Sequence, residues 1–134
     1  MTAYQVELVL EGETDVWMTG SAFDAIHEHD GTEAGMEPDE PDQGLLRKIR
    51  HYSTHGFGKF EGRKRPIKYE GNGVYRIGYG DLFRIYGFYN GPQRREFIAI
   101  RPHLKRGQKN TARERNAIAE VQRAKDNGDW EKIT

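Results

Sequence analysis

Three closely spaced stretches between residues 74 and 101 constrain the fold more than any other part of the sequence. They read VYRIGYG at 74–80, LFRIYGFY at 82–89 and REFIAIR at 95–101, and each is rich in aromatic and β-branched residues. Such stretches predict strands. Gly80-Asp81 suits a tight hairpin turn between the first two, and Asn90-Gly91-Pro92 suits a wider turn after the second. The sequence therefore predicts an antiparallel meander of three strands.

The segments before this meander predict one further strand and two helices. Residues 4–10 (YQVELVL) alternate loosely in polarity and predict a strand. Ser21 is followed three residues later by Asp24, which resembles a capping box and predicts a short helix over residues 21–30. Residues 42–56 predict a second helix, capped by Asp42 and Gly56, because an apolar stripe recurs with the helical period at Leu45, Leu46, Ile49 and Tyr52.

A final helix is predicted after the meander, and it completes an α+β fold. Thr111 and Glu114 form a capping box at its start, and Asn127-Gly128 marks its end. Strands grouped together, with helices before and after them, predict a small antiparallel sheet made of the N-terminal strand and the meander, with helices on one face. We expect a single domain over residues 1–134, with a basic connector at 59–73 and a mobile acidic insertion at about 30–43.

Charge is divided unevenly along the chain, although the formal net charge is zero. Residues 1–43 contain twelve Asp and Glu and no Lys or Arg, whereas residues 44–134 contain all 21 Lys and Arg and nine Asp and Glu. This asymmetry predicts an interaction surface on the basic part, and nucleic acid is the polyanion that it would fit. The alternative is that the two parts neutralise each other within the fold.

Composition excludes several other classes of protein. The chain has no cysteine, so disulfides and thiolate metal sites are excluded. It has no apolar run of about 18 residues and no basic flank followed by an apolar stretch at its start, so we expect a cytoplasmic protein without a membrane span or secretory signal. His51 and His55 have a zinc-binding spacing, but no further ligand lies near them in the sequence, and we expect no metal site.

The candidate site is the basic turn where the third strand of the meander leads into the last helix. A helix N-terminus favours phosphate, and basic residues gather around this one. The two earlier strands of the meander add Arg76 and Arg84, which share the sheet with Tyr86 and Phe88 as possible stacking platforms. We expect phosphate contacts from the basic residues Arg76, Arg84, Arg101, Lys105, Arg106, Lys109 and Arg113. The alternatives are that the arginines are solvated or salt-bridged and that the aromatic residues are core.

Two stretches carry a resemblance to a known family. GNGVYRIGYGDLFRIYGFY has paired strands that each hold a basic residue, and FIAIRPHLKRGQKNTARERNAI has an apolar strand, a Lys105-Arg106-x-Gln108-Lys109 turn and a final helix. From residue 69 onward the chain thereby resembles the RelE/HigB/ParE superfamily of bacterial toxins from toxin–antitoxin pairs, and most closely its phage-derived HigB-like subgroup.

The resemblance implies a RelE-like fold and a mechanism. It implies inhibition of translation by cleavage of ribosome-bound mRNA, without metal or cofactor, and an antitoxin protein as partner. Arg84 matches the second-strand arginine of the family and would stabilise the phosphate, while Lys105 and Arg106 match the turn and would hold it. His103, with an ordinary pKa of about 6.5, would act as base or acid.

One departure from the family pattern leaves a second function open. RelE has a tyrosine on its final helix as an acid or base, whereas no tyrosine follows Tyr89 in this chain. His103 would have to replace that tyrosine. The alternative is a non-catalytic protein of the RelE/ParE fold that binds DNA gyrase or another partner.

Overall fold

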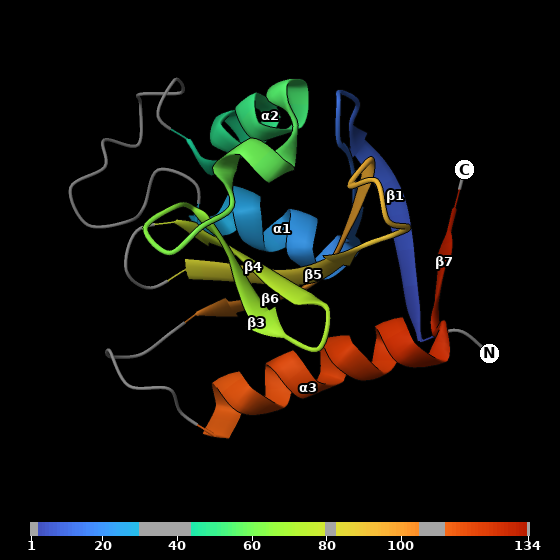
Figure 1. Cartoon of the computed structure of the whole chain (residues 1–134). Helices are drawn as coiled ribbons and strands as arrows, with labels where there is room; N and C mark the ends of the chain where they lie inside the picture. Colours follow the sequence, from blue (N-terminus) through green and yellow to red (C-terminus); the bar gives the residue numbers. More distant parts are fainter. Residues whose placement is uncertain (1–2, 30–43, 80–82, 105–111, 134) are drawn as a thin grey trace.

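An open seven-stranded sheet forms the centre of the molecule, and helices cover both of its faces (Figure 1). The structure is a computed structural model that describes residues 3–29, 44–79, 83–104 and 112–133. The elements in chain order are β1 Tyr4–Leu10, β2 Asp15–Thr19, α1 Gly20–His29, α2 Leu45–His55, the 3₁₀ helix η2 Phe57–Phe60, β3 Ile67–Gly71, β4 Val74–Tyr79, β5 Phe83–Tyr89, β6 Glu96–Leu104, α3 Ala112–Asn127 and β7 Trp130–Lys132. The predicted α+β class is therefore confirmed.

The strand order is β3-β4-β5-β6-β2-β1-β7. The predicted meander is confirmed, because β4, β5 and β6 pair antiparallel in sequence order. The prediction of a purely antiparallel sheet is wrong, because β2 pairs parallel to β6 and β7 pairs parallel to β1. The cause is two strands that were not predicted: β2 forms a hairpin with β1 and pairs parallel to β6, and β7 pairs parallel to β1.

The sequence reading also missed β3, which lies inside the predicted basic connector. β3 is an edge strand that pairs antiparallel with β4, and it carries the charged residues Lys68 and Glu70. Charged residues are common on edge strands because they discourage pairing with other chains. A polar edge strand therefore has a sequence that is difficult to distinguish from a loop.

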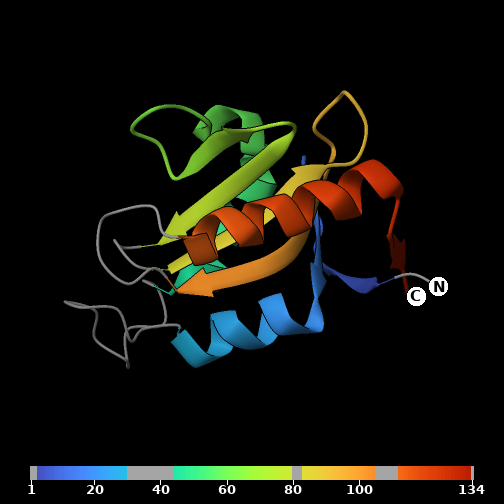
Figure 2. The same cartoon turned by 90° about the horizontal axis from the view of Figure 1, so that it is seen from below.

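The core has two layers, one on each side of the sheet. Helices α1 and α2 cover one face, and α3 covers the other (Figures 1 and 2). The expectation of helices on one face is therefore wrong. The central strand β5 supplies both layers, with Phe83 and Ile85 facing α1 and α2, and Tyr86 and Phe88 facing α3. Each fully buried apolar side chain of this size contributes about 1.5–3 kcal/mol to folding.

The helix ends agree with the predicted caps in part. Gly56 ends α2 with a φ of 97°, and its N–H donates to Tyr52 O at 2.8 Å. Gly128, with a φ of 62°, ends α3 as expected. The cap of α1 lies two residues before the predicted Ser21, because the Thr19 Oγ1 accepts the N–H of Ala22 at 3.2 Å. The predicted cap residues Asp42 and Thr111, the Gly80-Asp81 turn and the acidic insertion lie outside the described residues.

In the part of the chain that is described, no helix is both long and apolar enough to cross a bilayer.

Candidate anion-binding site

The pairing register aligns the predicted strand residues in two rows across one face of the sheet. One row runs through Lys68, Arg76, Tyr86 and Arg101 on β3, β4, β5 and β6. The next row pairs Gly78 with Arg84 and Arg84 with His103. Directly opposed residues of neighbouring strands point to the same face of a sheet. Arg76, Arg84, Arg101 and His103 therefore all lie on the face that α3 packs against.

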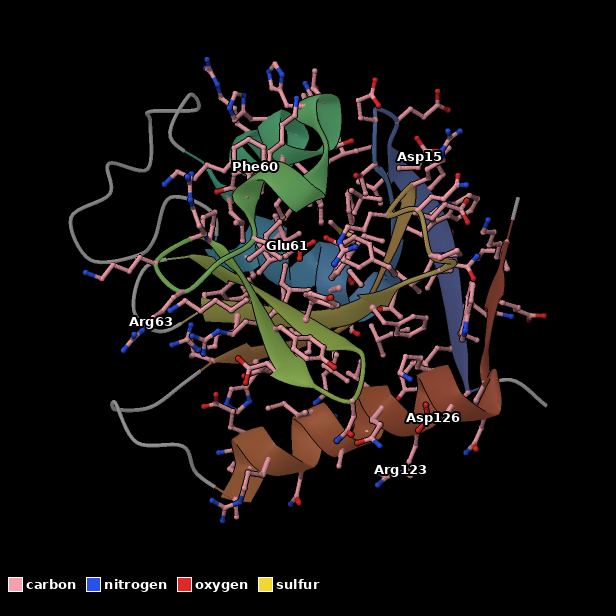
Figure 3. All side chains as sticks on the ribbon, in the orientation of Figure 1. Asp15, Phe60, Glu61, Arg63, Arg123 and Asp126 are labelled. Atoms are coloured by element: carbon pink, nitrogen blue, oxygen red, sulfur yellow. The ribbon has the colours of Figure 1, made fainter. Side chains whose placement is uncertain are left out.

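A cavity of about 310 Å³ opens at the end of this face beside β3. Most of its lining side chains are cationic and none is acidic, the residues being Lys64, Arg65, Pro66, Lys68, Arg76, Gly78 and Arg84. We call this the cationic pocket. Arg63, on the same loop before β3, extends outward at this edge of the molecule (Figure 3). So many cations around one recess favour a bound anion.

Arg84 extends across the cationic pocket because Gly78 opposite it has no side chain. A Cβ atom built on Gly78 would lie 3.3 Å from Arg84 Nη1, so the guanidinium lies close over this glycine. The Arg84 Nε is buried and has no hydrogen-bond partner within the described part of the chain. A buried donor without a partner costs about 1–3 kcal/mol. An anionic oxygen in the cationic pocket would remove this cost.

Arg76 differs from Arg84 because it already has a partner. Its Nε lies 3.0 Å from Glu70 Oε1, and both side chains are mostly buried, at 14% and 19% exposure. The salt-bridged alternative therefore holds for Arg76, which contributes a partly neutralised charge. Arg76 therefore adds positive charge to the wall of the cationic pocket, whereas the Nε of Arg84 has no partner among the described residues.

His103 lies opposite Arg84 and half-buried, with its ring centroid 6.2 Å from that of Tyr86. Burial lowers the pKa of His103 below its ordinary value of 6.5, and the positive charges of Arg101, Arg113 and Arg84 lower it further. The carboxylate of Glu114 acts in the opposite direction. The imidazole is therefore neutral near pH 7 and able to accept a proton.

Tyr86 and Glu114 form a buried pair beneath His103. Both are almost fully buried, at 0% and 1% exposure, and the Tyr86 hydroxyl donates to Glu114 Oε1 at 2.9 Å. Burial, followed by the hydrogen bond to Glu114, raises the pKa of Tyr86 above its ordinary value of 10. Tyr86 and Phe88 are buried against α3 in the core, so their interpretation as packing residues is confirmed and neither is available as a stacking platform.

The remaining predicted residues divide into those on the rim and those outside the described chain. Arg101 forms an ion pair with Glu120 of α3, which also accepts the Tyr4 hydroxyl, so its charge is partly neutralised. Arg113 is exposed near the start of α3 and close enough to influence His103. Lys105, Arg106 and Lys109 lie outside the described residues.

Sequence reasoning missed Lys64, Arg65 and Lys68 as members of the site. The run GRKRPIK at residues 62–68 was a visible signal of positive charge, but it was assigned to a connector. Only the pairing of β3 with β4 places these residues beside Arg76 and Arg84.

The described residues contain no group of three or more His, Asp or Glu that could hold a metal ion. His51 and His55 stack edge to face, with their centroids 4.6 Å apart.

Comparison with known proteins provides no relative for this arrangement. No family model, no curated protein and no solved structure matches the chain.

Proposed function

We propose that the cationic pocket binds the phosphodiester backbone of RNA, and that the chain is a RelE/HigB-like toxin that cleaves ribosome-bound mRNA. The observation that carries this proposal is the buried Nε of Arg84, which has no partner among the described residues and lies in the cationic pocket, with Arg84 paired directly opposite His103. The meander with a basic residue on each strand, closed by α3, supports the RelE-like part of the proposal. The β1–β2 hairpin, β3 and β7 would be additions to that scaffold. An antitoxin would neutralise the toxin by covering the cationic pocket.

The proposed reaction assigns one role to each group. His103 accepts the proton of a ribose 2′-hydroxyl, and the oxygen attacks the adjacent phosphorus. Arg84 and Lys68 stabilise the negative charge that accumulates on the phosphoryl oxygens. The bond from phosphorus to the 5′-oxygen breaks, and that oxygen takes a proton from the imidazolium or from water. The products are a 2′,3′-cyclic phosphate and a new 5′-hydroxyl end.

A specific observation favours the second candidate, a non-catalytic protein of the same fold. The family tyrosine is missing, and Tyr86 does not replace it, because its hydroxyl is buried and donates to Glu114. A raised pKa also makes this phenol a weaker acid. Among the described residues, His103 alone would then have to accept and return the proton. If it does not, the cationic pocket binds a polyanion or a partner without cutting it.

Inducible expression in bacteria, followed by mapping of mRNA 5′ ends, tests the proposal and separates the two candidates. We expect growth arrest and new 5′ ends in translated messages for the unaltered chain. Arg84→Ala and His103→Ala are expected to abolish both effects, whereas Arg123→Ala, on an exposed part of α3, retains them. Arrest with intact mRNA would support the non-catalytic candidate. Normal growth together with no RNA binding in vitro would refute the proposed function.

A further inference from the structure

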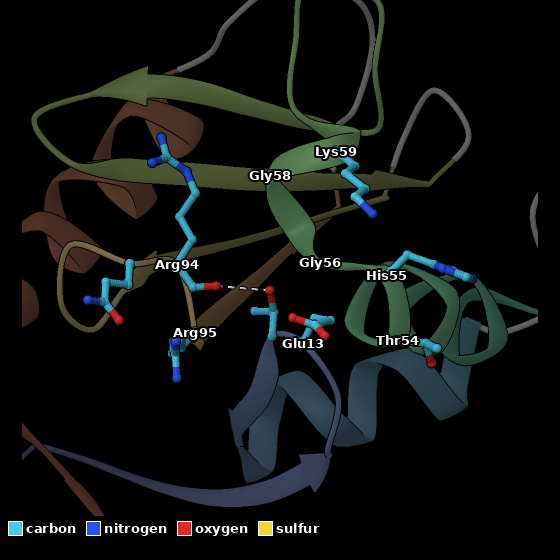
Figure 4. Close-up of a pocket in the computed structure, with 10 residues that line it drawn as sticks. Glu13, Thr54, His55, Gly56, Gly58, Lys59, Arg94 and Arg95 are labelled. Carbon is cyan, nitrogen blue, oxygen red and sulfur yellow. Dashed lines mark hydrogen bonds between the residues drawn. The ribbon is translucent and has the colours of Figure 1, made fainter.

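A second cavity, of about 760 Å³, lies beyond the other end of β5 (Figure 4). Three chain segments that are distant in sequence form it, namely the β1–β2 turn at 13–14, the end of α2 with η2 at 54–59, and the β5–β6 connection at 93–95. We call this the polar cavity. It shares no lining residue with the cationic pocket.

Buried hydrogen bonds around Thr14 fix the relative positions of these three segments. Thr14 is 1% exposed, and its Oγ1 donates to Arg94 O at 2.9 Å (Figure 4). The same Oγ1 accepts the N–H of Phe57 at 2.9 Å. The buried Ser53 Oγ donates to Thr14 O at 2.7 Å. Gly12 permits this close approach, because a Cβ atom there would lie 2.3 Å from Ser53 O. The polar cavity is therefore formed by fixed walls, as small-molecule sites generally are.

Several charged side chains at this cavity have no partner among the described residues. Glu13, Lys59 and Arg95 make no side-chain hydrogen bond or ion pair in the described part of the chain, and His55 has only the ring contact with His51. The neighbouring Arg94 differs, because its guanidinium turns away and donates to Glu61 at 2.8 Å. Two cations, an imidazole and one carboxylate therefore surround the polar cavity without neutralising one another through direct contacts.

We propose that the polar cavity binds a small phosphorylated molecule with free hydroxyl groups, such as a nucleoside monophosphate or a sugar phosphate. Lys59 and Arg95 supply charge-assisted hydrogen bonds to the phosphate, for which both side-chain types are suited. Glu13 accepts hydrogen bonds from the hydroxyl groups, which a carboxylate does and a cation does not. The volume falls in the range of about 300–1,000 Å³ that is usual for small-ligand sites.

Titration of the full chain with inorganic phosphate, ribose 5-phosphate and AMP, followed by amide NMR, tests this proposal. We expect saturable shifts of the Gly56 and Gly58 signals, with tighter binding of the two organic phosphates than of phosphate alone. Lys59→Met and Arg95→Met are each expected to weaken binding of all three probes about tenfold. Glu13→Gln is expected to weaken binding of ribose 5-phosphate and AMP while phosphate affinity stays the same or rises.

Matched controls separate this site from the cationic pocket. Arg123→Met removes an exposed cation elsewhere and is expected to leave every affinity unchanged. Arg84→Met changes the cationic pocket and is expected to leave the Gly56 and Gly58 titrations unchanged. The proposal is overturned if no probe gives saturable shifts, if shifts occur only at Gly78 and its neighbours, or if the doubly substituted Lys59→Met/Arg95→Met protein binds normally while folded. Equal effects of Glu13→Gln on phosphate and AMP would refute the assigned role of the carboxylate.

Discussion

Arg84 on β5 and His103 on β6 are paired directly across the sheet, although 19 positions separate them in the sequence. This pairing depends on an irregularity between Tyr86 and Gly87, where the register shifts by one residue. Gly87 pairs with Ala99, and continuing that register without a shift would place Arg84 opposite Pro102. A shift of one residue turns a side chain to the other face of a sheet. The bulge therefore brings His103 to the same face as Arg84.

Gly87 is the residue that this bulge requires. A Cβ atom there would lie 2.2 Å from Ile98 O, a backbone atom that cannot rotate away. We expect Gly87→Ala to lower the free energy of unfolding by about 1–3 kcal/mol, measured by urea denaturation. Gly78→Ala is the matched control, because its Cβ would meet the flexible Arg84 side chain at 3.3 Å and Pro66 O at an ordinary contact distance of 3.7 Å. It should change stability by less than about 0.5 kcal/mol while weakening RNA binding. Equal destabilisation by both substitutions would refute the role of the bulge.

The substitution Arg84→Met tests whether Arg84 contributes to RNA binding rather than to the stability of the fold. We expect a loss of RNA affinity, because the substitution removes a charged donor from the cationic pocket. The plot of log affinity against log salt concentration should become shallower by about one unit, measured by fluorescence anisotropy. The free energy of unfolding should stay equal or rise, because the substitution removes a buried donor that has no partner in the described part of the chain. A marked fall in stability would mean that Arg84 is a structural residue.

Local patterns predicted the elements whose residues follow a clear strand or helix period. The meander, α2 and α3 follow from alternation and helical periodicity in 74–101, 42–56 and 111–127, and the structure contains all of them. Two of the missed strands, β2 and β7, have a parallel partner that is distant in sequence, whereas β3 pairs with its chain neighbour β4 and was missed because of its charged residues. DVWMT at β2 is a five-residue strand with almost no alternation, because four of its residues are buried. It becomes a recognisable strand only when β1 and β6 lie on either side of it.

The sequence predicted that the site is basic, but it did not predict all of the residues that form it. Alternation placed Arg84 and Tyr86 on one face, but it also suggested an accessible Tyr86, which is covered by α3. Glu114 was assigned to a capping box because of its spacing from Thr111, and no local pattern predicts its hydrogen bond to Tyr86. The pairing of Lys68 with Arg76 depends on β3, which was not predicted. Contacts between side chains of different layers depend on the tertiary fold, so local sequence patterns do not predict them.

Three tyrosines, one buried and two half-buried, predict a loss of stability at alkaline pH. Burial and a hydrogen bond to Glu120 raise the pKa of Tyr4 to about 12, and similar causes raise the pKa values of Tyr86 and Tyr89. The unfolded value is about 10. A raised folded-state pKa favours the protonated native form, so its stabilising effect is complete below pH 10 and is lost as pH rises through the folded pKa. We expect urea midpoints to fall steeply above about pH 10.

Tyr86→Phe separates the contribution of this one phenol from the others. The substitution removes the donor to the buried Glu114, so we expect it to destabilise the protein by about 1–3 kcal/mol at neutral pH. The alkaline fall in the urea midpoint should also become shallower than in the unaltered chain. An unchanged pH profile would show that the other tyrosines account for the whole effect.

The charges around His103 allow its titration to be moved in both directions. Burial lowers its folded pKa below the unfolded value of about 6.5, so this group contributes stability above about pH 6.5 that is lost as pH falls through the folded pKa. Arg113→Gln removes a positive neighbour and should raise the pKa of His103, whereas Glu114→Gln removes a negative neighbour and should lower it. Imidazole NMR signals measure both changes. If His103 is the base, the acidic limb of the cleavage rate against pH should move with each pKa, and a rate profile that stays fixed would exclude His103 as the base.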